Sequence, residues 1–228
     1  MLAAPARRRR RVRQFLVSAL VAVLALVGAI GVAAPAYADD EVVVGVPDWS
    51  GLDVTHYAGP IPAQPGTLIA KVPLASALTL PAAGSAYRVQ FSTLDQHNKK
   101  ATSTGAAFLP KGTAPVGGWP VISWAHGTVG MNDDCTPSAF PRSARDVEYL
   151  GHWLQQGYAV VAADYVGLGT PGLMAYLDGK AAAHSIVDIV VASSQAGLGL
   201  GKKWAIIGQS QGAACSASSR GAPPAIRY

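Results

Sequence analysis

Apolar and polar positions alternate with two different periods along the chain, and each period predicts its own kind of element. Residues 86–95 and 101–110 carry β-branched and aromatic residues on either side of a short polar stretch, which predicts an antiparallel hairpin. The apolar runs 119–127 and 158–165 have the length of strands that are buried in a parallel sheet. The run 204–208 predicts a third buried strand.

Two longer segments between these runs have helical periodicity. The apolar side chains of residues 143–156 recur at spacings of three and four, as on one face of a helix that Gly157 ends: Val147, Leu150 and Leu154. Residues 178–195 form a second amphipathic segment, with Asp188 near the polar side and three residues on the apolar side: Ile186, Ile189 and Val190. Both segments are expected to be helices that cover a sheet.

The order of the predicted elements indicates the fold class. A hairpin is followed by strand, helix, strand, helix and strand, which is typical of an α/β domain. We expect a mostly parallel sheet with an N-terminal antiparallel hairpin and with helices on both faces. The sequence contains no internal repeat.

The first residues read as a targeting segment rather than as part of the fold. Six arginines between positions 7 and 13 precede an apolar run from Phe15 to about Ala34, and Ala36-Tyr37-Ala38 follows as an A-x-A site. This pattern predicts a secretory signal peptide, residues 1–38, that is cleaved after Ala38, and hence a secreted protein. The alternative is an uncleaved membrane anchor, because about 20 apolar residues can span a bilayer.

Removing residues 1–38 changes the charge. The whole chain has 18 Lys and Arg against 13 Asp and Glu, a net charge of +5, but the leader contains six arginines and no acidic residue. The mature chain is therefore close to neutral, and no nucleic-acid partner is expected.

The rest of the chain divides into three parts. Residues 39–66 are rich in Pro and Gly and are expected to form an arm that lies over the domain, residues 67–212. Residues 213–228 form an atypical tail, in which Pro223 and Pro224 break any helix. The two cysteines permit a disulfide in an exported protein, and their spacing matches no zinc motif, so no metal is expected.

The sequence Gly208-Gln209-Ser210-Gln211-Gly212 has the Gly-x-Ser-x-Gly spacing of a hydrolase nucleophile. It directly follows a predicted strand, so the chain can make the sharp strand-to-helix turn that exposes the serine. Ser210 is the candidate nucleophile, and the amide of Gln211 is the first candidate donor to an oxyanion. A tight turn without chemistry is the alternative.

A second oxyanion donor is expected from the loop after an earlier strand. His126 and Gly127 follow the strand 119–125 at that place, as in the HG-type loops of lipases and esterases. An ordinary turn with a packed histidine is the alternative. The match to G-x-G-x-x-G at residues 167–172 contains Pro171 and lies too far before the next helix for a dinucleotide site, so no dinucleotide cofactor is expected.

Several separate blocks of sequence carry a resemblance to a known family. They are PGTLIAKVPL, VISWAHGTVG with DDCTPS after it, YAVVAADYVGLGTPG, YLDGKAAAHSIVDIV and GQSQG. From about Pro65 to Gly212 the chain resembles, in this order of blocks, the secretory lipase family of exported α/β-hydrolases.

The resemblance implies a cofactor-free hydrolase of carboxylic esters, with triacylglycerols or other lipid esters as substrates and with contact to a membrane or lipid interface. It implies that Ser210 is the nucleophile, that the loop from His126 forms the oxyanion region, and that Asp164 and Tyr165 form a pocket wall with an orienting role. It also implies that Cys135 pairs with a cysteine that this chain lacks.

The sequence departs from the α/β-hydrolase pattern after the nucleophile. In that fold the catalytic Asp or Glu and then the His follow the serine, but the 18 residues after Ser210 contain no Asp, Glu or His. We therefore expect an incomplete α/β-hydrolase fold, truncated after the elbow by a premature stop, a frameshift or a fragmentary gene, and an inactive chain. His126 is the one histidine expected close enough to Ser210 to replace the missing base.

Two functional hypotheses remain open. The first is a secreted serine lipase or esterase of which this chain carries the nucleophile. The second is a non-catalytic exported protein that uses the same half-fold to bind lipid or to adhere to a surface.

Overall fold

The structure is a computed structural model of the 228-residue chain, and it describes residues 50–218, without the side chains of residues 215–218. The predicted signal peptide, the first part of the arm and the end of the tail lie outside the described residues. None of the helices within residues 50–218 is long and apolar enough to cross a membrane.

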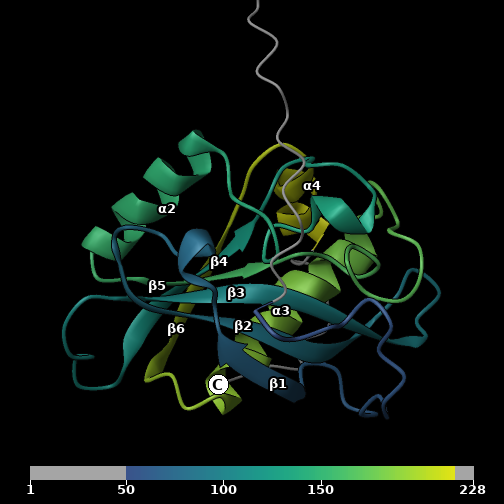
Figure 1. The fold of residues 1–228 in the computed structure, drawn as a ribbon, viewed down its shortest axis with the longest axis horizontal. Helices are drawn as coiled ribbons and strands as arrows, with labels where there is room; N and C mark the ends of the chain where they lie inside the picture. Colours follow the sequence, from purple (N-terminus) through teal and green to yellow (C-terminus); the bar gives the residue numbers. More distant parts are fainter. Residues whose placement is uncertain (1–49, 219–228) are drawn as a thin grey trace, which may run out of the picture. The chain divides into compact units, whose positions relative to one another are not determined.

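A six-stranded mixed sheet forms the centre of the described part (Figure 1). In spatial order its strands are β1 (Leu68–Pro73), β2 (Ala83–Leu94), β3 (Lys100–Pro110), β5 (Ala159–Ala163), β4 (Trp119–Ala125) and β6 (Leu200–Gly208). Strands β1, β2, β3 and β5 pair antiparallel, whereas β5, β4 and β6 pair parallel. The predicted hairpin is β2 and β3, and the predicted parallel strands form the other half of the sheet.

The helices begin where side chains cap them. Helix α2 (Ala144–Gln155) follows Ser143, whose hydroxyl accepts a hydrogen bond from the Asp146 amide at 3.2 Å. Helix α3 (Gly179–Gln195) follows Asp178, whose carboxylate accepts from two amides of the first turn. These caps satisfy N–H groups that have no partner inside the helix. The other helical segments are the 3₁₀ turns η1 (Ser76–Leu78) and η2 (Asp133–Cys135) and helix α4 (Gln211–Ser218).

The buried side chains form two clusters, one on each face of the sheet, and successive side chains of β4 belong alternately to one and the other. Val121 and Ala125 belong to the cluster that contains the buried side chains of α3, whereas Ile122 and Trp124 belong to the cluster of α2. Because successive side chains of a strand point to opposite faces, α2 and α3 cover opposite faces. The α/β class and the placement of helices on both faces are therefore confirmed.

Residues 50–66, the described part of the predicted arm, contain no helix or strand. Val54 is fully buried, and the carbonyl of Gly66 accepts a hydrogen bond from the Gln195 side chain at 2.9 Å. The Gln195 side-chain oxygen also accepts from the Leu68 amide at 3.1 Å, so one amide group of α3 holds the junction between arm and β1.

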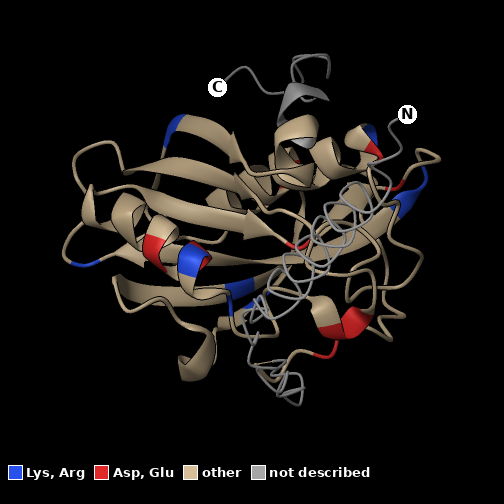
Figure 2. Cartoon of the chain, turned by 90° about the horizontal axis from the view of Figure 1, so that it is seen from above, with Lys and Arg blue, Asp and Glu red and all other residues tan. Residues whose placement is uncertain are grey.

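The expectation that residues 204–208 form a buried strand is wrong. Ala205 is exposed and Trp204 is only partly buried, because β6 pairs with β4 alone and is an edge strand among the described residues. Strand β1, at the opposite edge, was not expected. Charged residues are spread over separate elements of the described part (Figure 2).

The placement of Asp188 on a polar side of α3 is also wrong. Asp188 is buried, and its carboxylate accepts a hydrogen bond from the Thr93 hydroxyl at 2.8 Å. Helix α3 packs against β2, β5 and α4, so little of its circumference is polar surface. Burial raises the pKa of Asp188 to about 7, although the hydrogen bond from Thr93 acts in the opposite direction.

The raised pKa predicts that Asp188 makes the fold less stable as the pH rises from about 4 to about 7. In this range the folded chain keeps a proton that the unfolded chain releases. We expect Asp188→Asn, which still accepts the bond from Thr93, to remove this loss and to increase the free energy of unfolding at pH 8 by up to about 4 kcal/mol. Urea unfolding at pH 4 and pH 8 measures the effect. Asp53→Asn, at an exposed carboxylate, is the control, and an equal pH dependence in both variants contradicts the prediction.

Candidate active site

The three parallel strands end at one edge of the sheet, β4 at Ala125, β5 at Ala163 and β6 at Gly208. Carboxyl ends of strands in α/β sheets are where such folds bind ligands. Every site residue that the sequence predicts follows one of these ends directly: His126, Gly127, Asp164, Tyr165, Ser210 and Gln211.

Ser210 lies in a strained turn between β6 and α4. Its φ is +53°, in the left-handed region that side chains other than glycine rarely adopt, and the residue is exposed. Helix α4 begins at the next residue, and the Ala213 amide donates to the Ser210 carbonyl at 2.9 Å. Strain of this kind costs about 1–3 kcal/mol and is concentrated at functional sites. The geometry is that of a nucleophile elbow.

Gly212 allows α4 to pack tightly against the end of β4. A Cβ atom at this position would lie 1.9 Å from the carbonyl oxygen of Ala125, which no side chain can do without backbone movement. The same carbonyl accepts a hydrogen bond from the Gln209 amide at 3.1 Å. The second glycine of the motif is therefore required by packing.

The loop after β4 runs past both neighbours of Ser210. A Cβ atom on Gly127 would lie 2.1 Å from the side-chain oxygen of Gln209, so the loop and the elbow are in close contact there. One residue further on, the Thr128 hydroxyl lies 3.4 Å from the side-chain oxygen of Gln211. The loop therefore contacts the side chains of both sequence neighbours of Ser210.

The ring of His126 is buried and faces backbone carbonyl groups. Nδ1 lies 2.6 Å from the carbonyl oxygen of Gly127, and Nε2 lies 3.3 Å from that of Asp164. A carbonyl only accepts, and a neutral imidazole donates from one nitrogen, so the shorter distance assigns the proton to Nδ1. Burial lowers the pKa of His126, although the carbonyl of Gly127 and the charge of Asp164 oppose this shift. In this tautomer Nδ1 carries the proton, and Nε2 faces the carbonyl of Asp164 rather than Ser210.

The carboxylate of Asp164 is completely buried and joins three segments. It accepts hydrogen bonds from the Thr104 hydroxyl of β3 at 2.7 Å, from the Ser138 amide at 2.9 Å and from the Ser138 hydroxyl. Ser138 in turn accepts from Nε of Arg88 at 2.9 Å. Asp164 therefore fixes the end of β5 from behind the site.

Tyr165 connects the end of β5 to the loop after β4. It is buried with φ of +76°, and its hydroxyl donates to the His126 carbonyl at 2.8 Å. The rings of Tyr165 and His126 stack with centroids 4.2 Å apart. The orienting role that the resemblance implies for Tyr165 stays a prediction.

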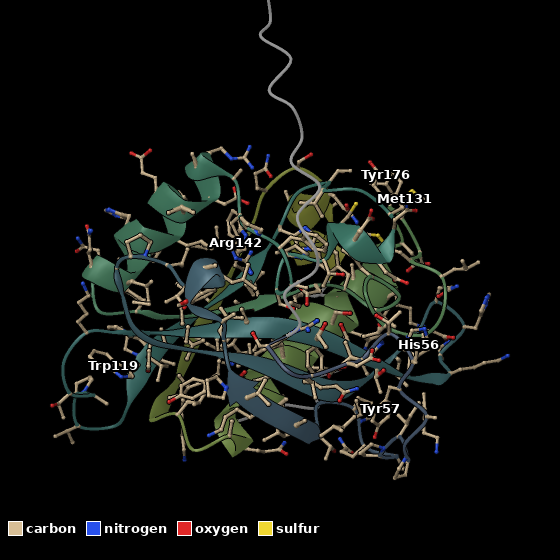
Figure 3. The ribbon with its side chains drawn as sticks, viewed as in Figure 1. His56, Tyr57, Trp119, Met131, Arg142 and Tyr176 are labelled. Carbon is tan, nitrogen blue, oxygen red and sulfur yellow. The ribbon has the colours of Figure 1, made fainter. Side chains whose placement is uncertain are left out.

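Sequence reasoning missed several residues that build this edge. Gln209 and Thr128 lie next to residues that the motifs do mark, but nothing in the motifs indicates that their side chains pack against the opposite loop. Ser138 lies in the DDCTPS block, and only the structure shows that it holds Asp164. Arg142 lies between α2 and the sheet (Figure 3), and no motif marks it. Burial lowers the pKa of Arg142, although the charges of Asp164 and Asp146 oppose this shift.

Two loops beside the elbow expose apolar side chains. Met131 and Tyr176 lie together in Figure 3, and the Tyr176 hydroxyl lies 3.0 Å from the Thr128 hydroxyl. Leu173 is 85% exposed and Leu177 is 60% exposed. With Val129 they make up five of the seven large apolar side chains that are exposed in the described part.

The described residues contain no group of three or more His, Cys, Asp or Glu that could hold a metal ion. Cys135 is a free thiol in η2, and burial raises its pKa. The disulfide that the resemblance implies stays a prediction.

Comparisons with known proteins agree with the resemblance. Residues 143–225 match the sequence model of the family described as secretory lipase. Lipase A of Candida antarctica in its closed state superposes with a TM-score of 0.57 at 19% identity, over 72% of this chain and 41% of that one. The rice cell wall degrading esterase LipA of Xanthomonas oryzae superposes with a TM-score of 0.56 at 23% identity, over 70% and 45%. No curated protein matches the chain. At these identities the two structures show that the fold is shared, and the chain spans less than half of either.

The contact between Gly212 and Ala125 predicts opposite effects of alanine at two helical glycines. Gly212→Ala is expected to lower the free energy of unfolding by about 2 kcal/mol or more, because a new Cβ meets backbone. Gly151→Ala in α2 is the matched control: its Cβ would lie 3.6 Å from the Ala82 Cβ, in ordinary contact. Helix propensity then makes Gly151→Ala stabilising by up to about 1 kcal/mol. Urea unfolding of both variants checks the contrast, and equal effects contradict the role of Gly212.

Proposed function

We propose that this chain carries the nucleophile and the oxyanion hole of a secreted serine carboxylic-ester hydrolase that acts on lipid esters such as triacylglycerols. The observation that carries the proposal is Ser210 at φ +53°, between a strand end and a helix, with the loop of Gly127 and Thr128 against the side chains of its two sequence neighbours. The match to the secretory lipase family and the shared fold of a lipase and an esterase support it.

The proposed reaction is acyl transfer in two steps. The Ser210 hydroxyl oxygen attacks the ester carbonyl carbon, its proton passes to a base, and the carbonyl oxygen becomes an oxyanion. Amide donors of Gln211 and of the loop after β4 stabilise that charge. The bond to the alcohol oxygen then breaks, and the alcohol leaves with a proton. Water next hydrolyses the acyl ester on Ser210, which releases the carboxylic acid and restores the serine.

The general base is the part of the mechanism that the described residues do not provide. The ring of His126 donates to a backbone carbonyl, and His56 lies in the arm, away from α4 in Figure 3. His97 and His152 are exposed on a turn and on α2. His184, half-buried on α3, makes no hydrogen bond to Ser210 within residues 50–218. Loss of the histidine from a serine triad lowers turnover by about 10⁶, so a polypeptide of these 228 residues hydrolyses esters poorly.

The exposed apolar loops suit a lipid ester better than a small polar one. Five apolar side chains are exposed on the loops after β4 and β5, and one of them, Tyr176, lies against Thr128. They offer contact area to acyl chains, whose transfer from water is favourable. The same surface is the observation that favours the second candidate, a non-catalytic lipid-binding protein. The two differ in whether Ser210 is reactive.

Ser210 is expected to be the residue that a fluorophosphonate modifies. Its oxygen bonds to phosphorus and fluoride leaves, as in the proposed acylation. Since the described residues provide no base, we expect slow labelling that added imidazole accelerates. Peptide mass spectrometry locates the adduct, and hydrolysis of p-nitrophenyl butyrate by the same sample is expected to stay close to the buffer rate.

Two variants make this test decisive. Ser210→Ala removes the proposed nucleophile, and Ser194→Ala, the control, removes an exposed serine near the end of α3. An adduct that survives Ser210→Ala and rapid ester hydrolysis by the 228-residue chain each contradict the proposal. Unlabelled Ser210 together with saturable binding of a fluorescent fatty acid favours the non-catalytic candidate instead.

Export is the last part of the proposal. The arginine-rich apolar leader and the family's description as secretory support cleavage after Ala38. Expression in a secreting host is expected to yield a product whose N-terminal residue is Asp39, as determined by mass spectrometry. A membrane-bound product that retains residues 1–38 would instead establish the anchor.

A further inference from the structure

We propose that His126 and Tyr165 are positioning residues that fix the orientation of two successive peptide groups, so that the N–H groups of Gly127 and Thr128 face the oxyanion. This inference rests on the proposed function, because it assigns the loop after β4 a role in stabilising the tetrahedral intermediate. It replaces the alternative in which His126 acts as the base for Ser210.

The first peptide group is held by Tyr165. Its hydroxyl donates to the carbonyl oxygen of His126 at 2.8 Å. A peptide bond is planar, and no cis peptide is present among residues 50–218, so C=O and N–H of one peptide group point in opposite directions. The N–H of Gly127 therefore points away from the Tyr165 hydroxyl.

The second peptide group is held by the ring of His126 itself. Nδ1 donates to the carbonyl oxygen of Gly127 at 2.6 Å, which turns the N–H of Thr128 away from the ring. Neither the Gly127 nor the Thr128 amide donates to another group in the described part of the chain. These two unused donors lie in a loop that contacts both sequence neighbours of Ser210, so they are available to an oxyanion there.

The positioning pair is itself rigid. Both side chains are buried, and their rings stack at an interplanar angle of 29°. Tyr165 keeps a left-handed φ of +76°, which the hydrogen bonds of the neighbouring Asp164 carboxylate help to hold. Donors that are fixed before the reaction need no reorganisation when the charge develops.

Removing single hydrogen bonds from this pair tests the proposal. The rate at which a fluorophosphonate labels Ser210 in the 228-residue chain is the first readout, since that reaction also places charge on an oxygen. Tyr165→Phe keeps the stacked ring and loses only the hydroxyl, and we expect labelling to slow by about 10-fold; the loss of a whole oxyanion donor lowers rates by about 10²–10³. His126→Phe is expected to slow labelling by a similar factor. His126→Asn, whose amide can still donate to the Gly127 carbonyl, is expected to recover most of the rate.

Tyr158→Phe is the matched control, because Tyr158 packs edge-on against Trp153 on the α2 side of the sheet. We expect it to label as fast as the unsubstituted chain. Equal rates for Tyr165→Phe and the unsubstituted chain overturn the proposal, as do equal rates for His126→Asn and His126→Phe. A merely structural role would lower stability without this recovery by asparagine.

Nitrogen-15 NMR of the histidine rings in the unsubstituted chain is the second readout. We expect His126 to be a neutral Nδ1–H tautomer at neutral pH, and we expect Tyr165→Phe to shift the Gly127 and Thr128 amide signals. A ring that is charged at neutral pH, or that carries its proton on Nε2, overturns the proposal. If Ser210 in the unsubstituted chain is not labelled at all, the proposed function fails, and NMR still decides whether the pair holds the loop.

Discussion

The buried carboxylate of Asp164 is the group on which the geometry of the candidate site depends. It lies directly after β5 and accepts hydrogen bonds from β3 and from the segment after η2. A buried carboxylate is tolerable only when hydrogen bonds and opposite charge compensate for its lost hydration, and here Thr104, Ser138 and the charge of Arg142 do so. Moving the end of β5 would break these bonds together. The backbone of Tyr165, one residue later, therefore has little freedom.

The sequence predicts an element well where that element buries one face and the apolar residues recur with the matching period. The hairpin of β2 and β3 and helix α2 have the alternation or the spacing that their packing requires, and both are found as expected. The prediction fails where the environment depends on neighbours that local pattern cannot indicate. Asp188 is polar yet lies inside, because α3 is covered on several sides and Thr93 provides a partner. Strand β6 is apolar yet partly exposed, because its neighbours lie on one side.

In the candidate site, the motifs likewise indicate the positions of some residues but not the contacts that their side chains make. The spacing of the glycines marks Ser210, because a strained turn that packs against backbone tolerates few residues other than glycine. At Gly212 the reason is the contact with the Ala125 carbonyl. His126 is marked by its place after a strand, but its function depends on where its two nitrogens point. Only the structure shows that both face carbonyl groups. Residue type alone suggested a base, whereas the geometry favours a fixed neutral ring.

Two strained residues lie on opposite sides of the loop after β4. Tyr165 follows β5 on one side and Ser210 follows β6 on the other, and both have left-handed φ values. From the first side the loop receives the hydroxyl and the stacked ring of Tyr165, and from the second it meets the side chains of Gln209 and Gln211. A left-handed backbone is unfavourable by itself and persists only where surrounding contacts determine it. Packing between three adjacent strand ends is therefore what keeps the serine exposed and the two amides of the loop in place.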